Sequence, residues 1–261
     1  MISSRSRRFL HFLVCCLAVY GLALVFTYCF QERRIYFPPP PASTRFDVRF
    51  PRPDGLALGG WVAPGSSDNA LVVFGGNAQA LEPWRARQGL AGCTNRTLIL
   101  VPYRGYEGNP GSPREKDLVA DGQAVVKWAR AHYNHVGILG ISLGSGVGTA
   151  VAAQEGAGID VLMLGTPYDR LDRVAQDLMP WLLPKLLMKD RYASVERAPR
   201  VGAPVYVLRA ENDALIRAPR TAALVKAFGQ NAHETVVPGG HETGWLSPAA
   251  CDWLKQSSRP E

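Results

Sequence analysis

Cysteine is scarce in this sequence, with 5 copies among 261 residues. None of them has the C-x-x-C spacing of a metal site, so we expect no bound metal. Cys15, Cys16 and Cys29 lie in an apolar run near the N-terminus, whereas Cys93 and Cys251 lie in the remainder of the chain. These last two are either separate buried thiols or one disulfide, which a location outside the cytoplasm would permit.

A concentrated patch of basic residues is also lacking, although the formal net charge is +7. Residues 1–34 account for +4 of this charge, and the remaining +3 is scattered along the chain. Because nucleic-acid-binding domains gather Lys and Arg on one face, nucleic acid is excluded as a partner. A hydrophobic content of 47% and a charged content of 20% are ordinary for a folded protein and exclude extensive disorder.

Asp, Glu, Lys and Arg are absent from residues 9–30. A helix of this length spans about 33 Å, enough to cross the hydrocarbon core of a bilayer. The basic segment 1–8 precedes it, so the positive-inside rule predicts a cytoplasmic N-terminus and a body on the outer (periplasmic or extracellular) face. We expect a single-pass signal anchor. A cleaved signal peptide, with its site near Gly21-Leu22-Ala23, is the alternative, but the apolar run continues to Phe30.

Four consecutive prolines, Pro38 to Pro41, predict an extended linker over residues 31–44 that holds the body off the bilayer. The body, residues 45–261, begins with two strand-like segments, 46–50 and 56–62, joined by a Pro-Asp-Gly turn. Further strand-like segments lie at 71–74, 98–101, 136–141, 161–164, 205–208 and 234–237. Helical patterns separate them, so we predict an α/β fold with an N-terminal antiparallel hairpin, a mostly parallel sheet and helices on both faces.

Two of the intervening helices have local signals. One helical pattern covers residues 81–90. Another begins at Ser112-Pro113-Arg114-Glu115, where the spacing of Ser112 and Glu115 is that of a capping box and Pro113 occupies the first helical position.

The sequence Gly140-Ile141-Ser142-Leu143-Gly144 has the G-x-S-x-G pattern of a nucleophilic serine. It follows a strand-like segment and precedes a helix of small residues, 146–153. On such a sharp turn the Ser142 hydroxyl projects above the sheet, and the Leu143 amide can face an oxyanion. An ordinary glycine-rich turn is the alternative.

A serine nucleophile needs a base, because an unassisted hydroxyl is weakly nucleophilic at neutral pH. His241 lies in a glycine-containing loop after the last strand-like segment, which suits the chain order Ser, Asp, His. Asp213 follows segment 205–208 and would orient the imidazole, with Glu211 as its rival.

A second oxyanion donor is expected after segment 71–74, in the loop Gly75-Gly76-Asn77-Ala78. The backbone amide of Gly76 or of Asn77 would point at the developing charge. A plain strand-to-helix turn is the alternative interpretation.

Several segments together resemble the membrane-anchored α/β-hydrolase family that includes the Bem46-like proteins and, more distantly, depalmitoylating thioesterases and S9/S33-type serine peptidases. These segments are VVFGGNA, VPYRGYEGNPGSP, LGISLGSG, PWLLPKLLMKDRY, LRAENDALI and GGHETGW, and the resemblance covers about residues 36–254. It implies the α/β-hydrolase fold and a small cap inserted at about residues 166–200. It also implies that Ser142, Asp213 and His241 form a catalytic triad and that Asn77 and Leu143 lie at the oxyanion.

One departure from the family concerns Gly75, which stands where the family usually has histidine. The backbone donors survive this change, so activity is still expected. The cap contains the apolar stretch 179–188, which either lines an acyl pocket or contacts the membrane surface, or else packs as ordinary helices.

The resemblance implies a serine hydrolase that cleaves carboxylic esters or thioesters through an acyl-enzyme intermediate. Its expected substrate is a small-molecule or lipid-like acyl compound, and the mechanism needs no metal or organic cofactor. A serine peptidase or amidase with the same triad is one alternative. A non-catalytic, membrane-anchored scaffold is the other, with Gly75 as its main support. The sequence makes no prediction of the oligomeric state.

Overall fold

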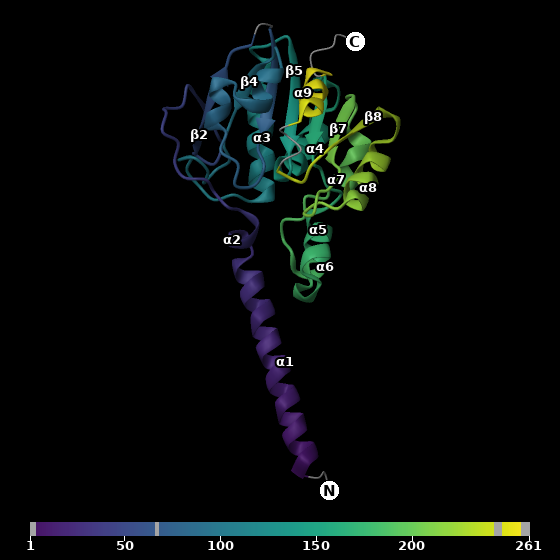
Figure 1. The fold of residues 1–261 in the computed structure, drawn as a ribbon. Helices are drawn as coiled ribbons and strands as arrows, with labels where there is room; N and C mark the ends of the chain where they lie inside the picture. The colour runs from purple at the N-terminus through teal and green to yellow at the C-terminus, as the bar shows by residue number, and fades with distance from the viewer. Residues whose placement is uncertain (1–3, 66–67, 243–246, 257–261) are drawn as a thin grey trace.

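A 27-residue helix, α1 (Ser4–Phe30), projects from the rest of the protein in the computed structural model, which describes residues 4–65, 68–242 and 247–256 (Figure 1). Its large apolar side chains are mostly exposed. By length and composition, the segment Arg5–Phe30 could cross a membrane. This is consistent with the predicted single-pass anchor.

The body is built on an eight-stranded sheet in the order β1-β2-β4-β3-β5-β6-β7-β8. Its strands are β1 (Val48–Pro51), β2 (Ala57–Ala63), β3 (Asn69–Phe74), β4 (Thr97–Leu100), β5 (His135–Ile141), β6 (Leu162–Gly165), β7 (Val205–Ala210) and β8 (Ala232–Val237). Strands β1, β2 and β4 pair antiparallel, and all later neighbours pair parallel. The predicted fold, with its antiparallel start and mostly parallel sheet, is confirmed.

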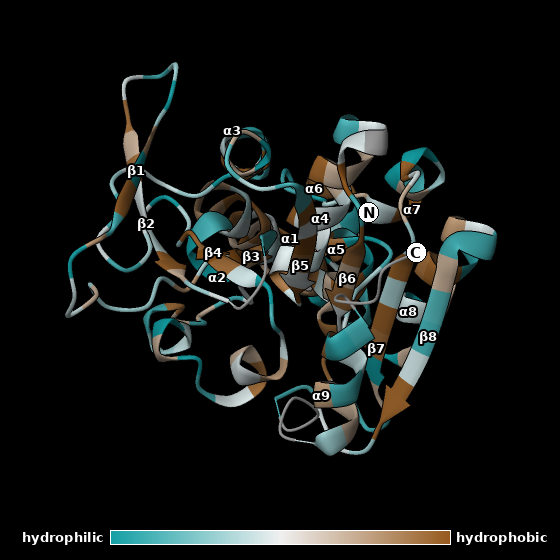
Figure 2. Ribbon diagram, turned by 90° about the horizontal axis from the view of Figure 1, so that it is seen from above, coloured by the Kyte–Doolittle hydropathy of each residue, from teal (hydrophilic) through white to brown (hydrophobic). Residues whose placement is uncertain are grey.

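Helices cover both faces of the sheet, and Figure 2 shows α3 and α9 on opposite sides of it. The α-helices after α1 are α2 (Glu32–Ile35), α3 (Glu115–Arg130), α4 (Leu143–Glu155), α5 (Leu171–Leu178), α6 (Pro184–Leu187), α7 (Ser194–Arg197), α8 (Ala218–Phe228) and α9 (Pro248–Lys255). The 3-10 helices are η1 (Glu82–Ala86), η2 (Gly89–Cys93), η3 (Gly156–Gly158), η4 (Pro180–Leu182), η5 (Ala198–Arg200) and η6 (Gly229–Asn231).

The core is divided by the sheet into two apolar clusters, because successive side chains of a strand point to opposite faces. On β3, for example, Val72 belongs to the cluster under α3 and α4, whereas Val73 belongs to the cluster under η2 and α9. On the face covered by η2 and α9, a disulfide joins Cys93 of η2 to Cys251 of α9, with their Cα atoms 5.2 Å apart. The structure thus selects the disulfide from the two alternatives that the sequence left open.

Two local predictions were wrong. The helical pattern at 81–90 forms two short 3-10 helices, separated at Arg87 by a left-handed backbone with φ of 55°. The proposed capping box does not form, because α3 begins at Glu115 after Arg114 without a side-chain cap. The Glu115 carboxylate instead accepts hydrogen bonds from the backbone amides of Arg191 and Tyr192, each at 2.8 Å, and so ties α3 to the cap.

Residues 31–44, predicted as an extended linker, make specific contacts with the body. Tyr36 is only 4% exposed, and its hydroxyl lies 2.8 Å from Asp190 Oδ2 and 2.9 Å from the Tyr192 hydroxyl. Further along, the backbone amides of Ser43 and Thr44 donate to the Glu82 carboxylate. Burial of the Tyr36 ring and these hydrogen bonds fasten the linker to the body.

Candidate active site

Ser142 lies on a sharp turn between β5 and α4, with a φ of 49° that non-glycine residues rarely adopt. The flanking glycines make this turn sterically feasible. A Cβ atom at Gly140 would lie 2.4 Å from the Gly144 carbonyl oxygen, and one at Gly144 would lie 2.0 Å from the Phe74 carbonyl oxygen. The turn therefore needs glycine at both positions, as the G-x-S-x-G pattern predicts.

The three residues predicted as a triad lie in hydrogen-bonding order. His241 Nε2 lies 3.0 Å from Ser142 Oγ, and His241 Nδ1 lies 2.7 Å from Asp213 Oδ2. These partners assign the neutral tautomer with its proton on Nδ1, so the serine hydroxyl donates to Nε2 and Nδ1–H donates to the carboxylate. The Asp213 side chain is only 3% exposed, which shields this hydrogen bond from water.

Asp213 and His241 are held by the loops that follow β7 and β8. Asp213 Oδ1 accepts hydrogen bonds from the amides of Leu215 and Ile216, at 2.9 Å and 2.8 Å. The neighbouring Asn212 amide donates to the carbonyl of Gly239, which connects the two loops. Glu211, the rival acid, is exposed, and its side chain accepts no hydrogen bond within the part of the chain that the structure describes. Thr243, Gly244 and Trp245 of the GGHETGW segment lie outside the described residues.

The predicted oxyanion donors differ in their environments. Leu143 is the first residue of α4, so its amide is among those that intrahelical hydrogen bonds leave unpaired. The Gly76 amide, in contrast, already donates to Gln79 Oε1 at 2.7 Å. The Asn77 side chain is also engaged, because its Nδ2 donates to the Ile35 carbonyl and its Oδ1 accepts from the Tyr106 hydroxyl. This leaves the backbone amides of Leu143 and Asn77 as the candidate pair.

The loop after β4, residues 101–109, supports the loop that contains these donors. The Tyr103 hydroxyl donates to the Gly75 carbonyl at 2.7 Å, and Glu107 accepts from the amides of Leu81 and Glu82. Burial raises the pKa of Tyr103 well above its ordinary value, so its hydroxyl stays protonated and able to donate. Burial raises the pKa of the Glu107 carboxyl as well.

A histidine side chain at position 75 would meet Leu81, since a Cβ atom there lies 3.1 Å from Leu81 Cδ2. Leu81 therefore packs closely against Gly75, and a larger residue at position 75 would require the Leu81 side chain to shift.

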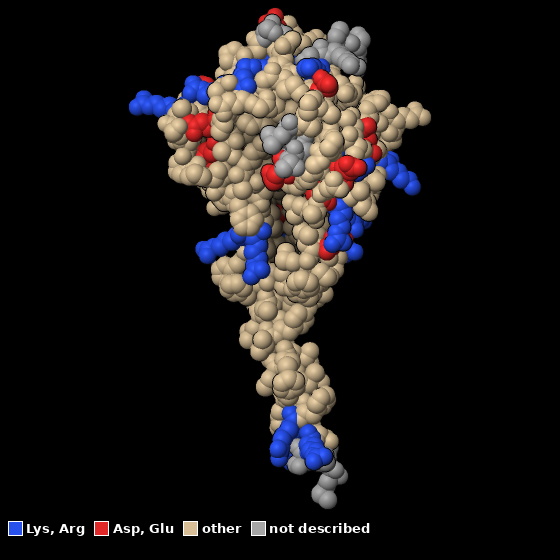
Figure 3. Space-filling model, viewed as in Figure 1, with Lys and Arg blue, Asp and Glu red and all other residues tan. Residues whose placement is uncertain are grey.

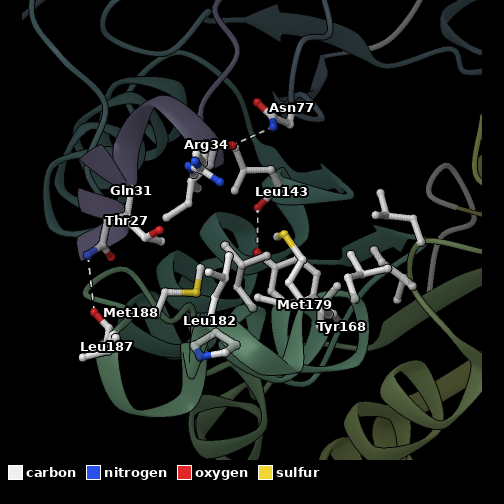
Figure 4. A pocket seen from close by; sticks show the side chains of 18 of the residues that line it. Thr27, Gln31, Arg34, Asn77, Leu143, Tyr168, Met179, Leu182, Leu187 and Met188 are labelled. Atoms are coloured by element: carbon white, nitrogen blue, oxygen red, sulfur yellow. Dashed lines mark hydrogen bonds between the residues drawn. The ribbon is translucent and has the colours of Figure 1, made fainter. Parts of the chain in front are cut away.

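A cavity of about 300 Å³ opens beside Ser142, and Figure 4 shows most of the side chains that line it. Its walls come from α1 and α2, the loop after β3, the cap and the loop after β7. The lining residues are Thr27, Tyr28, Gln31, Arg34, Ile35, Phe37, Asn77, Ser142, Leu143, Tyr168, Leu171, Val174, Ala175, Leu178, Met179, Leu182, Pro184, Leu187, Met188, Leu215 and Ile216.

Most of these lining residues were not anticipated from the sequence. For the cap stretch 179–188, lining a pocket was one of two alternatives, and the structure places several of its residues in the cavity wall. The participation of Thr27 and Gln31 was missed, because both belong to segments that were assigned to the membrane anchor and the linker. Their only signal is that they are polar residues near the end of an apolar run.

Known proteins similar to this chain include both relatives and solved structures, although no family model matches it. Uncharacterized protein Rv2307c of Mycobacterium tuberculosis is 34% identical over 238 residues, covering 84% of this chain and 83% of that protein. The alpha/beta hydrolase domain-containing protein WAV2 of Arabidopsis thaliana is 22% identical, covering 91% of this chain and 89% of that protein. A solved esterase structure from Pyrococcus furiosus has a TM-score of 0.66 and 17% identity, covering 84% of this chain and 98% of that one.

Proposed function

Because the chain belongs to the α/β-hydrolase superfamily, we propose that it is a membrane-anchored serine hydrolase that cleaves carboxylic esters or thioesters of acyl substrates. The observation that carries this proposal is the 3.0 Å approach of His241 Nε2 to Ser142 Oγ at the end of an apolar cavity. The esterase named in the comparison has the same fold, which is compatible with this chemistry.

In the first half of the reaction, Ser142 Oγ attacks the acyl carbon while His241 Nε2 takes the hydroxyl proton. Asp213 stabilises the resulting imidazolium through the Nδ1 hydrogen bond. The backbone amides of Leu143 and Asn77 hold the negative oxygen of the tetrahedral intermediate. His241 then gives its proton to the departing alkoxide or thiolate, the bond from carbon to that group breaks, and the acyl group remains on Ser142.

In the second half, water replaces the leaving group. His241 takes a proton from the water as its oxygen attacks the acyl carbon. The bond between the acyl carbon and Ser142 Oγ breaks, the proton returns to the serine, and a carboxylic acid is released. These steps require no metal or organic cofactor.

A serine peptidase or amidase could use the same three residues, but the walls of the cavity favour an acyl chain. The cavity that Ser142 lines also has apolar walls, including Leu171 and Met188, and a peptide backbone there would need polar partners. The scaffold alternative gives no reason for the alignment of a serine, a histidine and a buried carboxylate.

We further propose that α1 is an uncleaved anchor with the body on the outer face of the membrane. The basic residues before the apolar run support this orientation through the positive-inside rule. The disulfide between Cys93 and Cys251 supports it independently, because such bonds persist in oxidising compartments.

Labelling with a fluorophosphonate probe tests the proposed function. We expect the full-length protein in detergent to be labelled, Ser142→Ala to lose labelling, and Ser112→Ala, which removes an exposed hydroxyl, to keep it. A series of acyl esters and thioesters of increasing chain length then identifies the leaving group and the preferred acyl chain. Absence of labelling in a folded wild-type protein would favour the scaffold alternative.

A further inference from the structure

The cap packs against one face of α1 near the end of its apolar run. On this helix Leu24 and Thr27 are half-buried, and Gln31, the residue that follows it, is buried, at the spacing of a single helical face. Gln31 Nε2 donates to the Leu187 carbonyl at 3.3 Å, and the Lys189 amide donates to Gln31 Oε1 at 2.7 Å. Figure 4 shows the first of these hydrogen bonds at the edge of the cavity. The cap and α1 are thus in direct contact.

The contact extends into the part of α1 that is expected to lie in hydrocarbon. The Tyr20 hydroxyl donates to the Trp181 carbonyl at 2.5 Å. Tyr20 precedes Phe30 by ten residues, or about 15 Å along the helix. Even allowing for the length of the tyrosine side chain, Trp181 lies beside the last apolar turns of α1, on the membrane side of Gln31.

The outer surface of the cap at this level is apolar. Leu186 is 72% exposed and Trp181 is 61% exposed, and Leu183 is also exposed. Figure 3 shows an uncharged surface along α1 between the basic residues at its N-terminal end and those at its junction with the body. Lys185 is the one charged residue of the segment 178–188, and its long side chain can extend to the bilayer interface.

The cavity beside Ser142 lies between these two elements. Thr27 and Tyr28 of α1 form one wall, and Leu182, Leu187 and Met188 of the cap form another. An exposed apolar surface continuous with a membrane-spanning helix is a surface that lipid chains cover.

We propose that the cap segment 178–188 is inserted in the membrane leaflet next to the body and that the substrate is a lipid of this leaflet. Its acyl chain enters the cavity sideways, between α1 and the cap, and presents its ester carbonyl to Ser142. This inference rests on the proposed hydrolase function for its chemistry, and on the α1–cap contact for its geometry.

Lateral entry has a clear energetic advantage for a long acyl chain. The cost of transferring a chain from a bilayer into water rises with every CH₂ group, so a long chain is strongly disfavoured in water. A passage between the apolar faces of α1 and the cap avoids this cost because the chain never leaves apolar surroundings.

Fluorescence quenching tests the insertion without reference to catalysis. The full-length protein is reconstituted in phosphatidylcholine vesicles whose acyl chains are brominated, and its emission is compared with that of Trp181→Phe. We expect part of the wild-type quenching to disappear in the variant, because the other five tryptophans remain. Equal quenching in the two proteins would overturn the placement of the cap.

A charge on the cap tests the route of the substrate. We expect Leu186→Glu to lower the hydrolysis of a long-chain acyl lipid held in vesicles at least tenfold, while the hydrolysis of a short soluble ester and fluorophosphonate labelling stay near wild type. Val236→Glu, which changes a 47% exposed residue on β8, is the matched control and should leave all three unchanged. Unchanged vesicle activity in Leu186→Glu, or an equal loss on both substrates, would overturn the lateral route.

The two proposals can fail separately. If wild-type Ser142 is not labelled but Trp181 is quenched by brominated lipid, the hydrolase function fails and the membrane placement of the cap stands. If Ser142 is labelled and Trp181 is not quenched, the membrane placement of the cap fails and the hydrolase function stands.

Discussion

The side-chain amide of Asn77 donates a hydrogen bond of 2.6 Å to the backbone carbonyl of Ile35, 42 residues earlier in the sequence. The Oδ1 atom of the same side chain accepts from the Phe37 amide and from the Tyr106 hydroxyl, each at 2.9 Å. One amide group therefore joins the membrane-proximal segment, the loop 75–78 with the candidate oxyanion donor and the loop after β4. The position of a candidate catalytic donor depends on how the chain leaves the membrane.

Replacing Asn77 with alanine should loosen all three segments together. The partly buried partners would lose their hydrogen bonds, at a cost of about 1–3 kcal/mol. We expect the melting temperature in detergent to fall by several degrees and ester hydrolysis to fall more steeply than fluorophosphonate labelling. Gln123→Ala, which removes an exposed amide paired with Gln154, is the control and should change neither. Wild-type values in Asn77→Ala would contradict this coupling.

Asp213→Asn should keep the shape of the site and lose most of its activity. An amide in this position cannot stabilise the imidazolium and favours the wrong tautomer, so kcat should fall by about a hundred- to ten-thousand-fold. Steady-state hydrolysis of a soluble ester measures the effect. Asp252→Asn, which alters an exposed carboxylate paired with Lys255, should leave kcat unchanged. A loss of less than tenfold in Asp213→Asn would point to a different orienting acid.

Gly144→Ala should abolish labelling of Ser142. Its Cβ atom would lie 2.0 Å from the backbone oxygen of Phe74, so the turn at Ser142 or the end of β3 must move. Gly148→Ala on the same helix is a matched control, because the nearest atom to its Cβ is Ile138 Cγ2 at 3.1 Å. Labelling should largely survive there. Equal labelling of both variants would show that the turn tolerates the displacement.

The attachment of the linker should depend on pH through Glu82. Hydrogen bonds from the Ser43 amide, and then from the Ser43 hydroxyl and Thr44, lower the pKa of Glu82 from 4.5 to about 2. Since this pKa is lower in the folded protein, the stabilisation is present above about pH 4.5 and is lost as the pH falls towards about 2. The difference in melting temperature between wild type and Glu82→Gln should therefore shrink over this range. A constant difference would contradict this role for Glu82.

Much of the fold could be predicted because its signals are local. The strands are short apolar runs, and the turn at Ser142 requires glycine at positions 140 and 144 for steric reasons. The order of Ser142, Asp213 and His241 along the chain was enough to anticipate that they meet. Their catalytic roles stay predictions until the variants are measured.

The contact between α1 and the cap could not be predicted, because a membrane-spanning helix is apolar on every side. Its sequence therefore does not mark the face that packs on protein. The burial of Tyr36 against the body could not be predicted either. The prolines that follow it indicate an extended backbone whether or not the segment is bound to the body. The hydrogen bond from the Gly76 amide to Gln79 could not be predicted, because it depends on the rotamer of the Gln79 side chain and the sequence pattern does not indicate that rotamer.

The disulfide between Cys93 and Cys251 encloses Ser142, Asp213 and His241 in a single covalent ring. His241 is made 99 residues after Ser142, and Cys251 is made later still. The nascent chain consequently carries Ser142 through the synthesis of 99 further residues before His241, its proposed base, is present. Once the ring has closed, a protease that cuts one exposed loop between the two cysteines cannot release a fragment, and the two parts of the candidate catalytic centre remain covalently joined.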